Sequence, residues 1–291
     1  MNKSALSVVL LCIPLFSIAQ EQDLLKTLPS DSAKKEFVTG AFKSSRVIMG
    51  QSIEMIGKGV LDFRILHRFG EISSGADDFF GLDEATMRLA FDYGLSDNLT
   101  LGVGRSTLQK EFDGFIKYRP VRQATGAGAS PVAVVLVAGM TLNTFLADSV
   151  GFSDRTAYYL QAVIGRKFSN QFTMQVTPTY LRSNTVAAND DRNIFAVGIG
   201  GRYKFSNRMA FVVDYFYVTN KPTSEKFHNP LSVGIDIETG GHVFQLHFSN
   251  ANGMNERAFI AETRSDWGSG DIMFGFNLSR LFHIGRSSSN W

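Results

Sequence analysis

The segment YYLQAVIGRKFSNQFTMQVTPTYL, residues 158–181, contains the pattern that is most informative about the fold. At its centre the short turn FSNQF (168–172) joins two runs of alternating polar and apolar residues. Each run is about ten residues long, the length at which a tilted β-strand crosses a bilayer. Similar turns recur as LSDNL (95–99) and FSNRM (205–209). Ser-Asp and Ser-Asn pairs close tight hairpins because their side chains bond the local backbone. The repeated pattern predicts a transmembrane β-barrel.

Alternation of this kind extends over most of the chain. On the segment that begins at Met209, for example, apolar side chains share one face while Asp214 belongs to the other. Period two places one face in lipid and the other in the lumen. We therefore predict an all-β fold, a single transmembrane antiparallel up-and-down β-barrel of about 12 strands, plus or minus two. The predicted strands are 59–69, 85–93, 99–106, 111–119, 131–143, 156–167, 172–182, 192–204, 209–219, 231–238, 242–250 and 271–282.

The connections alternate between short and long, which predicts an orientation. Short turns follow the second, sixth, eighth and tenth predicted strands, and most long connections follow odd-numbered strands. The exceptions are a short connection after the third strand and a long one at 120–130. Membrane barrels place short turns in the periplasm and long loops outside. We therefore expect the Ser-Asp and Ser-Asn turns and both chain termini to be periplasmic.

The N-terminus has the pattern of an export signal. Lys3 precedes an apolar stretch, and Ser17-Ile18-Ala19 ends in the small-x-small pattern of a signal-peptidase site. Cleavage after Ala19 would remove Cys12, the only cysteine, so we expect no disulfide, thiolate nucleophile or Cys-ligated metal or haem. The net charge of +2 and the lack of a basic run argue against a nucleic-acid partner. The alternative fold is a soluble secreted β-sandwich or lipocalin-like barrel.

These patterns give the predicted domain organisation. Residues 1–19 are the signal peptide, 59–284 the β-barrel and 285–291 a C-terminal tail. Residues 20–58 are polar and mixed and show no strand pattern. We interpret them as an N-terminal periplasmic segment, with a plug in the lumen as the less favoured alternative.

The inward face of the predicted strands carries charges of both signs. Small barrels are filled by side chains and large ones are open, and a 12-stranded barrel lies between them. The charges therefore indicate either a cross-lumen salt-bridge network or a polar path for small solutes. The residues predicted to line the lumen are Asp62, Arg64, Arg68, Arg88, Asp92, Asp113, Lys117, Arg202, Asp214, Asp236, Glu238 and His247.

Several strings in the chain resemble a known family. They are FKSSRVI (42–48), HRFG (67–70), FFGLD (79–83), VGRS (103–106), KYR (117–119) and GHVFQLH (241–247). Together they resemble an uncharacterised outer-membrane β-barrel family of Gram-negative bacteria, carried as a domain of unknown function. The resemblance covers nearly all of the mature chain and implies a barrel in the outer membrane. It implies no activity and no functional residue.

The string HFSNA (247–251) is similar to the His-x-Ser-Asn element of outer-membrane lipases. Residues two apart on a strand share a face, so His247 could act as a general base for Ser249. In those families an acid or amide follows the Ser by about twelve residues. That position is Ala261 here, and Glu262 is one residue further on. The strand pattern also turns His247 and Ser249 toward the lumen instead of the lipid. We therefore expect no enzyme activity and keep His247, Ser249 and Glu262 as a distant lipase alternative.

We predict no cofactor and no metal, because the histidines show no close metal-ligand pair. The expected role is a passive or substrate-specific channel for small solutes. The alternative is a structural or surface-interaction barrel without conduction. Expected partners are outer-membrane lipid, the outer-membrane assembly machinery and an unknown small solute or periplasmic partner.

Overall fold

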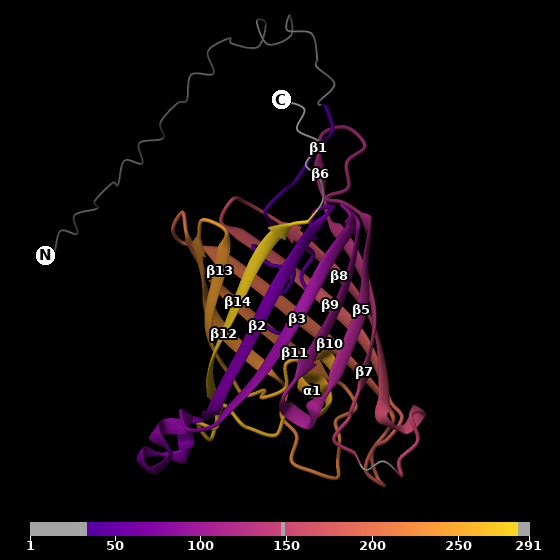
Figure 1. Ribbon diagram of the computed structural model, residues 1–291. Helices are drawn as coiled ribbons and strands as arrows, with labels where there is room; N and C mark the ends of the chain where they lie inside the picture. Colours follow the sequence, from indigo (N-terminus) through magenta and orange to yellow (C-terminus); the bar gives the residue numbers. More distant parts are fainter. Residues whose placement is uncertain (1–33, 147–148, 285–291) are drawn as a thin grey trace, which may run out of the picture.

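The computed structural model describes residues 34–146 and 149–284, and these residues form a closed antiparallel β-barrel with strongly tilted strands (Figure 1). The predictions for residues 1–33 and 285–291, which include the signal peptide and the C-terminal tail, lie outside the described residues. The twelve barrel strands are β2 (Val60–Glu71), β3 (Ala85–Ser96), β4 (Leu99–Ser106), β5 (Phe112–Val121), β7 (Ala133–Leu142), β8 (Thr156–Lys167), β9 (Phe172–Ser183), β10 (Asn193–Lys204), β11 (Met209–Val218), β12 (Leu231–Thr239), β13 (His242–Ser249) and β14 (Met273–His283).

The strands follow one another around the barrel in chain order, and β14 pairs with β2 to close it. Each observed strand coincides with a predicted one to within two or three residues at either end. The predicted barrel and its strand number are therefore confirmed. Closure leaves the barrel sheet without an edge, so each of its strands pairs with a neighbour on both sides, as a membrane requires.

The two ends of the barrel differ. The turn end carries the short connections 97–98, 168–171, 205–208 and 240–241, together with the start of β2 and the end of β14. It also carries the connection 122–132, where β6 (Ala124–Thr125) pairs with β1 (Glu36–Phe37) above the barrel in Figure 1. The loop end carries the connections 72–84, 107–111, 143–155, 184–192, 219–230 and 250–272. The last of these contains the only α-helix within the described residues, α1 (Glu256–Ala261).

Large apolar side chains cover the outer wall. Outward-facing residues such as Phe91, Val103, Leu160 and Phe211 are exposed because they belong to the face that meets lipid. Tyrosines lie near the strand ends at both rims, as the aromatic girdles of membrane barrels do. They are Tyr93, Tyr118 and Tyr203 toward the turn end and Tyr158, Tyr180 and Tyr217 toward the loop end.

Residues 41–56, here named the lumen hairpin, lie inside the barrel. The hairpin enters from the turn end and reverses at a tight turn, in which the Val47 N–H donates to the Gly50 carbonyl at 2.9 Å. It then returns toward the start of β2, with the Ser52 N–H bonded to the Ser45 carbonyl at 3.0 Å. Ile48, Met49 and Gln51 at its tip are 0% exposed. The structure thus differs from the favoured interpretation of a segment outside the barrel. The hairpin has no strand-like alternation because it is surrounded by wall on every side.

The hairpin, the wall and α1 share one apolar cluster. Phe42, Ile48 and Ile53 of the hairpin belong to it, as do wall residues of β5, β7–β11 and the α1 residue Phe259. The rings of Phe216 on β11 and Phe259 lie 5.0 Å apart between centroids. Burial of these groups gives the inside of the barrel the character of a protein core.

Candidate functional site

The filled lumen is the candidate functional site, and Asp214 on β11 holds the tip of the hairpin. Its Oδ2 accepts from three consecutive peptide N–H groups, those of Ile48 at 3.4 Å, Met49 at 2.9 Å and Gly50 at 2.7 Å. A tight turn leaves such N–H groups unpaired and pointing the same way, which suits an anion. The buried carboxylate and the buried turn therefore satisfy each other.

Side-chain amides of the wall bind the backbone of the hairpin. Gln245 donates to the Val47 carbonyl at 2.5 Å, and Asn277 donates to the Ile48 carbonyl at 3.0 Å. Gln175 uses both ends of its amide, donating to the Gln51 carbonyl at 2.6 Å and accepting from the Ile53 N–H at 3.1 Å. An irregular segment can lie at membrane depth only when its backbone groups are paired in this way.

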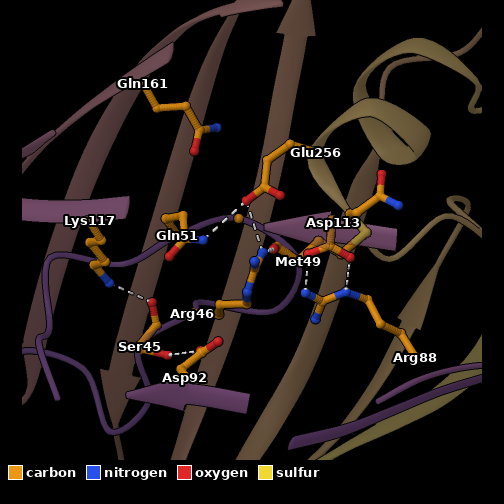
Figure 2. A network of polar contacts seen from close by, with 12 residues as sticks. Ser45, Arg46, Met49, Gln51, Arg88, Asp92, Asp113, Lys117, Gln161 and Glu256 are labelled. Atoms are coloured by element: carbon orange, nitrogen blue, oxygen red, sulfur yellow. Dashed lines mark hydrogen bonds and ion pairs between the residues drawn. The ribbon is translucent and has the colours of Figure 1, made fainter. Parts of the chain in front are cut away.

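Lys117 and Arg64 hold the hairpin near Ser45. Lys117 Nζ donates to the carbonyls of Ser45 at 2.9 Å and Glu54 at 2.7 Å. The Arg64 guanidinium donates to the hydroxyl of Ser45 at 3.0 Å. The same hydroxyl donates to Asp92 Oδ2 at 3.3 Å (Figure 2). Predicted lumen charges thus contact the hairpin directly.

An ion pair joins the hairpin to α1. The Arg46 guanidinium lies 3.0 Å from Glu256 Oε1 and also donates to the Met49 carbonyl at 2.7 Å (Figure 2). Gln51 donates to the same Glu256 oxygen at 3.2 Å. Both Arg46 and Glu256 are buried. The hairpin from the turn end and the helix from the loop end therefore meet inside the barrel.

Other predicted lumen charges bind one another along the wall. Arg88 on β3 forms a bidentate pair with Asp113 on β5, with Nε and Oδ1 at 2.8 Å (Figure 2). Arg202 on β10 pairs with Asp236 at 3.7 Å and Glu238 at 3.1 Å.

Asp62, Arg68 and Glu238 complete this set. Asp62 lies 3.4 Å from Arg64 and accepts from Ser279 at 2.6 Å. Arg68 donates to Asn277 Oδ1 at 3.1 Å, and the partly buried Glu238 also pairs with Lys43 of the hairpin at 2.9 Å. The structure thus places a salt-bridge network of both signs inside the barrel.

The three residues of the lipase alternative, His247, Ser249 and Glu262, are not hydrogen-bonded to one another. His247 is buried, and neither ring nitrogen has a hydrogen-bond partner among the described residues. The Ser249 hydroxyl bonds to that of Ser232 at 2.8 Å, and Glu262 pairs with Arg257 at 2.7 Å at the loop end. A Ser-His-acid site requires these groups in one hydrogen-bonded chain.

The sequence interpretation missed the residues that fill the lumen. Arg46 and Gln51 belong to a segment without periodicity, and Glu256 lies in a long connection. Gln175, Gln245 and Asn277 occupy inward positions of predicted strands, so their location could be read from the alternation. Their partners could not, because the hairpin had no predicted position.

The chain matches the family described as a membrane bound beta barrel domain (DUF5777) over residues 42–282. The chain belongs to this family. The match includes the hairpin as well as the strands. Barrels of this class lie in outer membranes, so the protein is an outer-membrane barrel. A search of curated proteins finds no match.

Three solved structures are similar to the chain in shape. The NanC porin is 10% identical with a TM-score of 0.49, covering 77% of this chain and 98% of the porin. The KdgM porin is 10% identical with a TM-score of 0.45, covering 77% and 99% of the two chains. The outer membrane protein OmpT of Vibrio cholerae is 12% identical with a TM-score of 0.38, covering 77% and 96%.

Proposed function

We propose that this protein is an occluded channel. In the conformation described here the lumen hairpin and α1 close it, and small polar solutes pass only after the hairpin withdraws. The turn end faces the periplasm, as short turns do in barrels of this class. The proposal depends mainly on one observation. Asp214 of the wall holds the hairpin tip by accepting hydrogen bonds from the N–H groups of Ile48, Met49 and Gly50.

The contacts of the hairpin are non-covalent and face a polar wall. Lys117, Gln175 and Asn277 would each remain in the lumen if the hairpin left, and they would offer hydrogen bonds to a solute. Both ends of the hairpin lie at the turn end, so it can leave in that direction without crossing α1. A polar wall with charges of both signs supports passage of small polar solutes with little charge selectivity.

A non-conducting barrel is the second candidate, and the apolar cluster favours it. Withdrawal of the hairpin would expose Phe42, Ile48 and Ile53, which now pack against the wall. Exposing such side chains costs about 1.5–3 kcal/mol each. A barrel that never releases the hairpin would serve as a structural or surface-interaction element.

A cysteine pair that locks the hairpin separates these two candidates. Ser45 and Asp92 are the chosen positions because their side chains are in contact, with oxygens 3.3 Å apart. Formation of the disulfide would be checked by thiol titration before each recording. Both would be changed to Cys in a Cys12→Ser background, and the refolded protein would be placed in planar bilayers. We expect rare conductance steps from the reduced pair and none from the oxidised pair, because only the reduced hairpin can leave.

Asp214→Asn is the complementary variant, since it weakens the hydrogen bonds that hold the hairpin tip instead of locking the hairpin in place. We expect more frequent conductance steps than for the unmodified chain. Steady conductance with the hairpin locked would overturn occlusion. Silence from every variant that folds, as judged by heat-modifiable gel migration, would instead favour the non-conducting barrel.

We propose no catalytic role for His247, Ser249 and Glu262. Their separate hydrogen-bond partners support this, as does the burial of His247 in the lumen wall. Hydrolysis of outer-membrane phospholipid by the refolded protein, lost on Ser249→Ala, would contradict it.

A further inference from the structure

A cavity of about 460 Å³ lies among the connections of the loop end, apart from the filled lumen. Residues within 143–146, 154–157, 185–191 and 222–227 form its walls, and residues of α1 together with Glu262 and Arg264 form the floor. Its volume falls in the range of about 300–1,000 Å³ that is usual for small-molecule sites.

The floor is a fixed polar network around Arg257 of α1. The guanidinium bonds to Glu111 at 2.5 Å, Glu262 at 2.7 Å and Gln109 at 2.7 Å. Asn143 donates to the same Gln109 oxygen at 2.5 Å. Burial lowers the pKa of Arg257, but the two carboxylates outweigh this effect and raise it. The floor therefore presents amide and carboxylate groups, and the charge of Arg257 is already neutralised by Glu111 and Glu262.

Gln109 has a backbone that its residue type rarely adopts. Its φ is +51°, in the left-handed region, and it is followed by Lys110 at +47°. Such strain persists only where neighbours hold it, and it clusters at ligand sites. Here it turns the Gln109 amide toward Arg257, Glu262 and Asn143.

Paired charges also fix the rim. Asp190 accepts from the Ser224 hydroxyl and from the backbone of Ser224 at 2.9 Å, which ties two of the wall connections together. Arg264 and Glu225 form an ion pair beside it. The lining also contains Asp154, Arg155, Asp191 and Lys226, so carboxylates and cations are interspersed around the cavity. A ligand with a net charge of either sign would therefore meet like charge here, and its desolvation would be poorly compensated.

Apolar side chains complete the lining. Phe145, Leu146, Phe227 and Ala261 face the cavity, and Phe145 is 69% exposed. An exposed aromatic face beside hydrogen-bonding groups suits a molecule that has a C–H face and several hydroxyl groups.

From this lining we propose that the cavity binds a neutral polyhydroxylated molecule of mono- to disaccharide size. The hydroxyl groups pair with Asn143, Gln109 and Glu262, and a ring face stacks on Phe145. The site lies on the side of α1 that faces away from the lumen, so this proposal does not depend on whether the barrel conducts.

Binding to the refolded full chain tests the proposal directly. Isothermal titration and saturation-transfer NMR would compare glucose, maltose and sucrose with glucuronate and glucosamine, which resemble glucose but carry a charge. The detergent must be an amine oxide, because alkyl maltosides would compete for the site. We expect at least one neutral sugar to bind in the millimolar range, more tightly than either charged sugar.

Two variants and one matched control locate the site. We expect Asn143→Ala to weaken binding about tenfold through a lost polar partner. Phe145→Ala should weaken it about fivefold, and its exposure leaves folding unaffected. Asn170→Ala, an exposed amide at the turn end, should bind as the unmodified chain does. Absence of binding by all three neutral sugars, equal binding of the charged ones, or binding that survives both variants would each overturn the proposal.

Discussion

Arg46 and Glu256 form an ion pair at 3.0 Å inside the barrel, although 210 residues separate them along the chain. Arg46 belongs to the hairpin that enters from the turn end, and Glu256 begins the helix of a connection at the loop end. The pair thus joins the two elements that close the lumen. The hydrogen bond from Gln51 to the same Glu256 oxygen and the tilted ring contact of Phe259 with Phe216 support this junction.

Removing one partner of this pair should be costly. We expect Arg46→Met to lower the free energy of unfolding by about 3–5 kcal/mol, because Glu256 is left charged and buried. The double variant Arg46→Met with Glu256→Gln should recover much of that loss. Guanidinium unfolding in micelles, followed by tryptophan fluorescence, measures both. The single variant Glu256→Gln completes the double-mutant cycle, and strictly additive effects of the two single variants would show that the pair contributes no coupling.

Asp214→Asn should loosen the tip of the hairpin. The neutral amide can still accept a hydrogen bond, but the charge that favours three N–H donors is gone. Hydrogen bonds to charged groups contribute about 1.5–3 kcal/mol each, so exchange of these amides should accelerate by about ten- to a hundredfold. Hydrogen–deuterium exchange of a peptide that covers residues 47–51 measures this effect. Asp97→Asn, at an exposed turn, should leave that peptide unchanged.

The hairpin also packs closely against the wall at Gly200, where a larger residue would force its neighbours to move. A Cβ added at Gly200 on β10 would lie 2.9 Å from Val47 Cγ2. We expect Gly200→Ala to destabilise the seated hairpin by about 1–3 kcal/mol, the usual cost of overpacking. Trypsin cleavage near Lys43 and Arg46 should then become faster. Gly114→Ala is the matched control, because its Cβ would find the nearest atom at 3.6 Å and the cleavage rate should not change.

The hydrogen bonds of Asp190 to Thr223 and Ser224 join the connections 184–192 and 219–230 beside the loop-end cavity, and this contact, here named the Asp190 clamp, should resist acid. The Ser224 hydroxyl and the backbone N–H groups of Thr223 and Ser224 stabilise the Asp190 carboxylate and lower its pKa to about 2. A carboxyl group whose pKa is lower in the folded than in the unfolded state stabilises the folded state. Its full contribution is present above the unfolded-state pKa of about 3.9. That stability is lost as the pH falls through the folded value of about 2. The clamp should therefore remain closed from pH 7 to pH 4 and weaken below that.

Spin labels at Ala188 and Lys221, one in each connection, would report the distance between them by electron paramagnetic resonance. We expect one narrow distance at pH 7 and pH 4 and a broader distribution at pH 2. Asp190→Asn should be broad at every pH. A broadening already at pH 4 in the unmodified chain would contradict the lowered pKa.

The barrel follows from local sequence patterns. Period-two alternation and hydrophilic turns after about every tenth residue are local properties of the chain, and they are sufficient to place the strands. The inward position of charges such as Asp62, Arg88 and Asp214 follows from the same alternation. Successive residues of a strand point to opposite faces, so every second residue points into the barrel. The connection lengths likewise separate the turn end from the loop end.

The contents of the barrel, in contrast, depend on contacts between segments that are far apart in the chain. Residues 41–56 show no alternation of polar and apolar side chains. A segment enclosed by protein on all sides has no lipid-facing side that must be apolar. Their contacts join positions far apart in sequence, such as Ile48 with Asn277 and Arg46 with Glu256. Such pairings depend on which groups the closed wall brings within hydrogen-bond distance. For that reason the alternation could predict polar inward residues but not whether a solute path or a folded hairpin lies between them.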